Sequence, residues 1–345
     1  MTSWLFLVAY TCSGLAGLVY EVTWTRLLTL YLGHTTAAAS AVVGAFLGGL
    51  AIGAAIGGRL ASEWAPRRCL KAYVVFEAAV AICALLLPIE LSMFSPVLRW
   101  SYNDAAALFP LIRILSCIVM VMLPALALGA TFPMAIRWLA RDSGEPARES
   151  SRLYFVNTAG AAIGALLAGF VLIPSLGMSG TIHVAMGGTA LAAICVLAAL
   201  SVNDASPDSR LTKSPLTTAR NQPSYAPPWL AIGVLGVSGF AALVHEIAWT
   251  RILSLVLGPT TYAFAATLAA VIAGVAIGSG IGASLISSRA NKAAGMLAFT
   301  LSLAAVTASW TYAAAGSRLP MMVARHVADL ADFDQLLLRG VLSPE

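Results

Sequence analysis

The chain carries one apolar segment twice, and this internal repeat limits the folds that are open to it. Residues 13–53 and residues 238–278 align at a constant offset of 225 positions, and 22 of the 41 aligned residues are identical. Both copies contain a Glu, a Trp and an Arg within an otherwise apolar stretch. The repeat therefore predicts two copies of one structural unit, each with charged side chains in an apolar setting.

The composition indicates the environment of that unit. Apolar residues make up 59% of the chain and charged residues only 10%, whereas soluble domains carry roughly 25% charged residues. Several apolar runs reach the roughly 20 residues that a helix needs to cross a bilayer. We therefore expect an all-α, multi-pass membrane helix bundle. Its nine predicted spans are 4–31, 36–57, 72–92, 112–136, 154–174, 179–200, 229–256, 261–286 and 293–314.

The order of these spans predicts the domain organisation. Residues 1–200 form a first membrane half of six helices, and residues 201–228 form a polar, Ser- and Pro-rich cytoplasmic linker. Residues 229–314 form a second half of three helices, and residues 315–345 form an amphipathic tail. Because six spans separate the copies, both enter the membrane in the same direction, as do the parallel halves of major facilitator transporters. The second half is expected to be truncated.

The charged residues orient the predicted bundle. Thirteen of the 20 basic residues lie in alternate loops, and the positive-inside rule places those loops and the N-terminus in the cytoplasm. The net charge of +5 is thus explained without a nucleic-acid partner. The five cysteines show no spacing that indicates a zinc site or a disulfide framework, so we expect no metal and no cofactor.

The repeated charged residues are the first candidates for a site. Each copy places one acidic, one aromatic and one basic side chain in a span, namely Glu21, Trp24 and Arg26, then Glu246, Trp249 and Arg251. Charges within a membrane tend to face the protein interior or water and to pair. Glu21 and Arg26 are five positions apart, about 140° around a helix, so each is expected to pair with the other copy instead. The alternatives are positions at the headgroup level, or carboxylates that line a cavity and attract a cation.

Further candidates lie in other spans. Glu77 is another acidic residue within a span, and Asn157 is a polar residue that is expected to hydrogen-bond a neighbouring helix or to contact a substrate. Glycines four apart let another helix approach closely. Such glycines occur in corresponding spans of the two copies, at Gly49, Gly53 and Gly57 and at Gly274, Gly278 and Gly282.

Several segments together resemble a known family. These are the two S-G-x-A-x-L-V-x-E-x-x-W-T-R segments, LPALALGATFP at 123–133 and YFVNTAGAAIGALLAGFVLIPSLG at 154–177. They resemble the membrane region of the bacterial proteins in which a major-facilitator-like region is fused to a spermidine synthase domain. The resemblance implies a bacterial inner membrane location. It transfers no catalytic residue, because no Gly-rich nucleotide-binding loop is found in this sequence.

These features predict a transporter-like membrane protein. It is expected to bind or move a small cationic molecule such as a polyamine, with Glu21, Glu77 and Glu246 as the acidic candidates. One alternative is a membrane anchor or regulatory module for a separately encoded, spermidine-synthase-like partner, and another is a truncated, inactive relic. Enzymatic activity is not expected, since the sequence contains no nucleophile–base pair, metal cluster or cofactor loop. The oligomeric state is left open.

Overall fold

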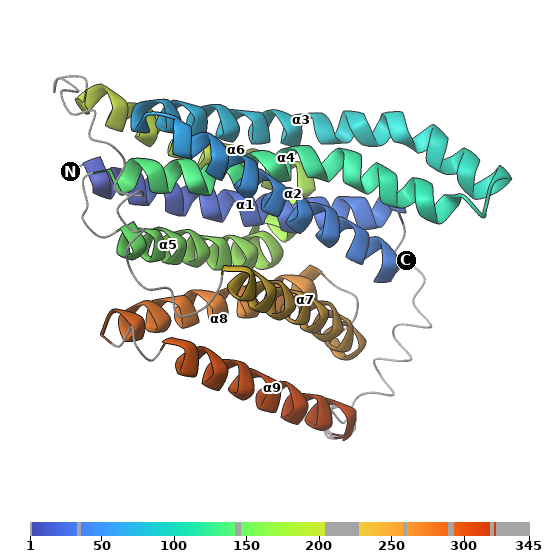
Figure 1. The fold of residues 1–345 in the computed structure, drawn as a ribbon. Helices are drawn as coiled ribbons and strands as arrows, with labels where there is room; N and C mark the ends of the chain where they lie inside the picture. The colour runs from blue at the N-terminus through green and yellow to red at the C-terminus, as the bar shows by residue number, and fades with distance from the viewer. Residues whose placement is uncertain are drawn as a thin grey trace. The chain divides into compact units, whose positions relative to one another are not determined.

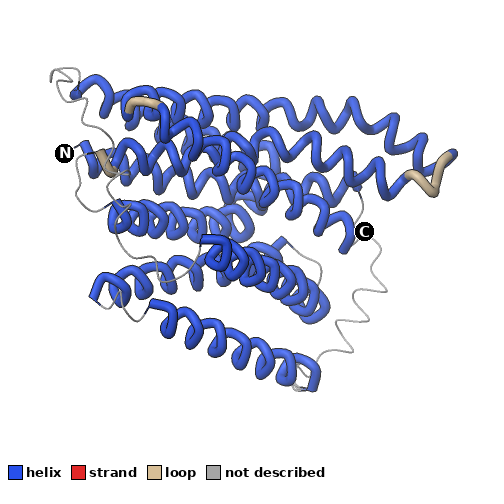
Figure 2. Tube along the Cα trace, in the orientation of Figure 1, coloured by secondary structure: helices blue, strands red, loops and turns tan. Residues whose placement is uncertain are grey.

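A computed structural model of the chain describes residues 2–32, 36–141, 146–203, 228–257, 261–288, 293–317 and 321. Every regular element in these ranges is helical (Figures 1 and 2). The helices are α1 (Thr2–Leu32), α2 (Thr36–Glu63), α3 (Pro66–Asp104), α4 (Phe109–Leu139), α5 (Pro146–Leu167), the π-helical turn η1 (Ala168–Leu172), α6 (Ile173–Asn203), α7 (Pro228–Leu257), α8 (Thr261–Ser288) and α9 (Ala293–Ser317).

Eight segments within the described ranges are long and apolar enough to cross a membrane. The fifth, Glu149–Ser201, has 53 residues, which corresponds to about 80 Å of continuous helix, more than twice the hydrocarbon thickness of a bilayer. It is interrupted at Gly177, whose φ of 69° is a conformation that glycine adopts without steric strain. Beyond this break α6 packs against α1 and α3.

The chain divides into two compact units. The first comprises Met1–Tyr225 and Phe264–Leu285, and the second comprises Ala226–Ala263 and Ile286–Glu345. Helix α8 thus belongs mainly to the first unit, whereas the sequence grouped it with α7 and α9. Most of the predicted linker lies outside the described residues, which include only 201–203 and 228 of it. The same holds for the predicted tail, of which only 315–317 and 321 are described.

Helix α1 is the central helix of the first unit. In its apolar window 67% of the residues are buried, against 39% or fewer in every other candidate span among the described residues. Its sequence is apolar around the whole circumference, which is the pattern of a helix surrounded by others. Helices α5 and α6 pack directly against it, and α3 and α4 pack against each other and reach it at fewer positions. Several polar side chains on α1 are therefore buried, among them Ser13, Glu21 and Thr23.

Glycines lie at tight contacts between α2 and α4 in the first unit. A Cβ on Gly53 of α2 would overlap the backbone carbonyl of Leu126 on α4, and one on Gly49 would lie 2.5 Å from the Cβ of Ala125. Gly57 continues the same seam, since a Cβ there would lie 2.9 Å from the Cα of Ala130. A larger side chain at any of these positions would push α2 and α4 apart.

Candidate functional site

A buried carboxyl group lies between α1 and α3 in the first unit. Glu77 of α3 is only 1% exposed, and the hydroxyl of Ser13 on α1 donates a hydrogen bond to its Oε1. Tyr73 precedes Glu77 by four residues, so both side chains project from the same face of α3. The Tyr73 hydroxyl lies beside Ser13 and Glu77 but meets hydrogen-bond geometry with no described atom. One carboxyl group and two hydroxyl groups thus converge in a space closed to solvent.

Aromatic rings surround this polar group. The ring centroids of Phe6 and Tyr10 on α1 each lie 6.0 Å from that of Tyr73, and both ring pairs are tilted. Tyr10 also stacks with Phe132 of α4 at 6.4 Å. Phe6, Tyr10 and Tyr73 are at most 2% exposed. Because aromatic faces are electron-rich, such rings attract cations as well as packing with one another.

The carboxyl group of Glu77 has no positively charged partner among the described residues. The described contact of its carboxyl group is with the neutral Ser13, and no described Lys, Arg or His forms an ion pair with it. An isolated carboxylate in a low-dielectric interior is unfavourable by several kcal/mol or more. Such a carboxyl group is stabilised by taking up positive charge, either as a proton or as a cationic group, and hydroxyl oxygens and ring faces lie beside it.

The repeated residues of the first copy lie further along α1. Glu21 and Trp24 are buried and Arg26 is half-buried. Tyr20 stacks on Trp24 with a centroid distance of 5.3 Å, and the Tyr20 hydroxyl lies 3.3 Å from that of Thr189 on α6. The buried Trp24 Nε1 has no hydrogen-bond partner among the described atoms.

The corresponding residues of the second copy, Glu246, Trp249 and Arg251, lie on α7. Helix α7 belongs to the second unit, whereas the first copy on α1 belongs to the first unit. The predicted pairing of each Glu with the Arg of the other copy therefore stays a prediction.

Asn157 lies on α5 where this helix meets α1. A Cβ on Gly14 would lie 2.7 Å from the Asn157 Oδ1 and would overlap its backbone carbonyl. Gly160 of α5 approaches the backbone of Thr11 equally closely. The amide of Asn157 is thus placed at a tight helix–helix contact.

The sequence named Glu77 but not the side chains around it. Ser13 carried a signal, because it is the first residue of the repeat and recurs as Ser238. Tyr73 carried a second signal in its four-residue spacing from Glu77. The contribution of Phe6 and Tyr10 depends on which face of α1 meets α3, and a helix that is apolar all round does not reveal that face.

Comparison with protein-family models, with curated proteins and with solved structures found no match to this chain. Among the described residues, no three His, Cys, Asp or Glu side chains gather into a group that would hold a metal ion.

Proposed function

We propose that this chain is a multi-pass, transporter-like membrane protein that binds a small organic cation at Glu77. The observation that carries the proposal is the burial of Glu77 within a helix apolar enough to span a membrane, with a neutral hydroxyl as its described partner. Ionisable residues within membrane helices are energetically expensive and mark binding sites or ion pathways.

The surroundings of Glu77 favour an ammonium group as the cation. A protonated amine carries three N–H donors, and the carboxylate of Glu77 with the hydroxyls of Ser13 and Tyr73 offers three acceptors. The rings of Tyr10 and Tyr73 add cation–π attraction, which is worth about 2 kcal/mol in a desolvated site. A polyamine such as spermidine has this chemistry at each amino group.

The buried position of the site also has a consequence for binding. At 1% exposure, Glu77 is reached by a ligand only when the helices around it separate. Alternating opening of this kind is what a transporter of the proposed type requires.

The proposal includes an architecture. The Glu149–Ser201 segment counts as two spans separated at Gly177, which gives nine spans with a cytoplasmic N-terminus in a bacterial inner membrane. The two repeat copies form parallel, major-facilitator-like halves, and the chain is related to the membrane region of the fused spermidine synthase proteins. The sequence repeat and the break at Gly177 support this reading.

Uptake of radiolabelled spermidine into proteoliposomes tests the function. We expect the wild-type chain to exceed empty vesicles and Glu77→Gln to lose at least about 2 kcal/mol of cation binding, or roughly 30-fold in affinity. Gln keeps the size of Glu and still accepts the hydrogen bond of Ser13, so the fold is expected to persist.

Glu90→Gln is the matched control for this experiment. Glu90 lies on the same helix but is half-buried, and its substitution should leave uptake unchanged. Wild-type uptake no higher than that of empty vesicles would refute transport, and equal uptake by Glu77→Gln and the wild type would remove Glu77 from the site.

A further inference from the structure

Basic residues gather at one end of the first unit. The end of α2, the start of α3, the end of α4 and the start of α5 meet there, because Ala61, Leu70, Trp138 and Leu153 share one buried cluster. The basic residues on these helix ends are Arg59, Arg67, Arg68, Lys71, Arg137, Arg141 and Arg152. The described acidic residues at the same helix ends are Glu63 and Glu149. This end therefore carries an excess of positive charge.

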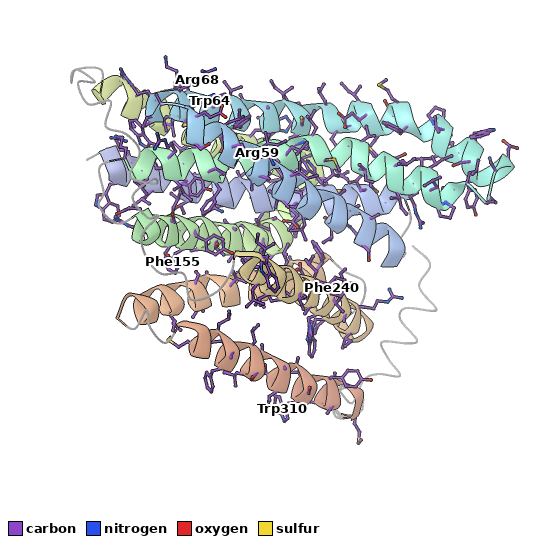
Figure 3. All side chains as sticks on the ribbon, viewed as in Figure 1. Arg59, Trp64, Arg68, Phe155, Phe240 and Trp310 are labelled. Carbon is purple, nitrogen blue, oxygen red and sulfur yellow. The ribbon has the colours of Figure 1, made fainter. Side chains whose placement is uncertain are left out.

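Three of these arginines stack on tryptophan rings. The guanidinium carbon of Arg68 lies 4.3 Å from the ring centroid of Trp64, and Figure 3 labels these two residues next to each other. The corresponding distance is 3.3 Å for Arg141 over Trp138 and 5.4 Å for Arg152 over Trp4. Stacking occupies the face of a guanidinium, so the N–H donors at its edge can bind other acceptors, as Nη1 of Arg141 binds the carbonyl oxygen of Trp138 at 3.0 Å. Of the three rings, that of Trp138 is buried, whereas the exposed ring of Trp4 is of the kind typical of the membrane–water interface.

The corner between α2 and α3 has the most complete arrangement. Trp64 closes the end of α2, and besides supporting Arg68 it accepts a hydrogen bond at its carbonyl oxygen from Nε of Arg137 on α4, at 3.4 Å. Arg68 and Lys71 are three residues apart on α3 and both are exposed, so they lie on neighbouring parts of one helix face. Neither forms an ion pair with another described residue.

An exposed apolar stripe continues from this corner along α3. Val75, Ile82 and Ile89 are 64%, 55% and 56% exposed. At 100° per residue they lie within about 40° of Lys71 around the helix, and they extend along about 21 Å of it from Val75 to Ile89. This length is sufficient for the acyl chains of one bilayer leaflet, which is about 15 Å thick.

We propose that the corner formed by Trp64, Arg68 and Lys71 is a binding site for the headgroup of an anionic phospholipid. The edge of the Arg68 guanidinium binds the phosphate in the bidentate manner that favours arginine, and the Lys71 ammonium adds a second positive charge. The acyl chains lie on the apolar stripe below. A soluble phosphorylated ligand would use the charges but not the stripe, so the stripe selects a lipid.

Native mass spectrometry of the full chain in detergent, with added phosphatidylglycerol or phosphatidylcholine, tests the site. We expect the wild type to retain phosphatidylglycerol preferentially at about 50 mM salt and to lose this preference at about 500 mM, where surface charges are screened. Arg68→Gln combined with Lys71→Gln should weaken phosphatidylglycerol binding about 25-fold, since each basic residue near a membrane surface contributes about fivefold.

Arg99→Gln is the matched control, because Arg99 is an exposed arginine near the other end of the same helix. It should bind phosphatidylglycerol as the wild type does. The proposal is overturned if the double variant binds as tightly as the wild type, if Arg99→Gln is weakened as much, or if inorganic phosphate competes as well as the lipid. Should the double variant fail to fold, a wild type without preference for phosphatidylglycerol at low salt overturns it equally.

Discussion

The two copies of the repeat carry the same glycine spacing but use it differently. In α2 the stripe of Gly49, Gly53 and Gly57 lies directly against α4. In α8 a Cβ on any of the corresponding glycines, Gly274, Gly278 and Gly282, would meet no described atom within 4 Å. Helix α8 instead directs Gly280 towards α5, where a Cβ would lie 3.6 Å from the ring of Phe155.

This difference shows that a stripe of small residues allows close helix packing but does not by itself produce it. Glycines four residues apart make a smooth helix face, and such a face allows close approach without selecting a partner. The partner is set by the surface opposite, which for α2 is the backbone of α4 around Leu126 and Gly129. The same glycine motif therefore contributes different amounts to the free energy of unfolding in α2 and α8. Gly→Ala substitutions measure the difference.

The largest effect is expected for Gly53→Ala. Its Cβ would overlap the backbone carbonyl of Leu126, and a backbone atom does not move aside as a flexible side chain does. We expect a loss of about 3 kcal/mol in the free energy of unfolding, at the upper end of overpacking effects. Unfolding of the purified chain by SDS titration, followed by circular dichroism, measures it.

Gly278→Ala is the matched substitution in the second copy. A Cβ there meets only open space among the described residues, and Ala is favoured over Gly within a helix by about 1 kcal/mol. The variant should be as stable as the wild type or slightly more stable. Equal destabilisation by Gly53→Ala and Gly278→Ala would mean that α8 has an equally close partner, and the contrast between the copies would disappear.

An intermediate effect is expected for Gly49→Ala, and it should be partly reversible. The added Cβ would lie 2.5 Å from the Cβ of Ala125 and 3.0 Å from the carbonyl oxygen of Met122. We expect a loss of about 2 kcal/mol. Combining it with Ala125→Gly removes the first contact but not the second, so about 1 kcal/mol should return as a coupling energy in a double-mutant cycle. Strictly additive effects of the two substitutions would contradict direct contact between these positions.

The sequence predicted the helical class and the membrane-spanning character because both follow from composition and from runs of apolar residues. It also placed Glu77 within a span, where an acidic residue is conspicuous. It did not predict that Ser13 binds Glu77, because these residues are 64 positions apart in the sequence and their contact depends on the rotation of α1 about its axis. For the same reason it gave equal weight to the glycine stripes of α2 and α8, since spacing along one helix contains no information about the surface opposite.

The smallest loss of stability is expected at the position where Tyr20 in the first copy corresponds to His245 in the second. The Tyr20 hydroxyl lies 3.3 Å from that of Thr189, which is a long hydrogen bond, while its ring stacks on Trp24. Tyr20→Phe removes the hydroxyl and keeps the stacking, so we expect a loss of about 1 kcal/mol in the free energy of unfolding.

Tyr20→His, which installs the residue of the second copy, also changes the ring that stacks on Trp24 and removes apolar surface from the core, so its loss should be larger. The same SDS titration compares the two variants. If Tyr20→His is no worse than Tyr20→Phe, the stacking on Trp24 contributes little, and the buried core of α1 tolerates the side chain that α7 carries. If Tyr20→His is clearly worse, the first copy depends on packing that the sequence of the second copy does not supply, which extends the contrast of the glycine stripes to the centre of the repeat.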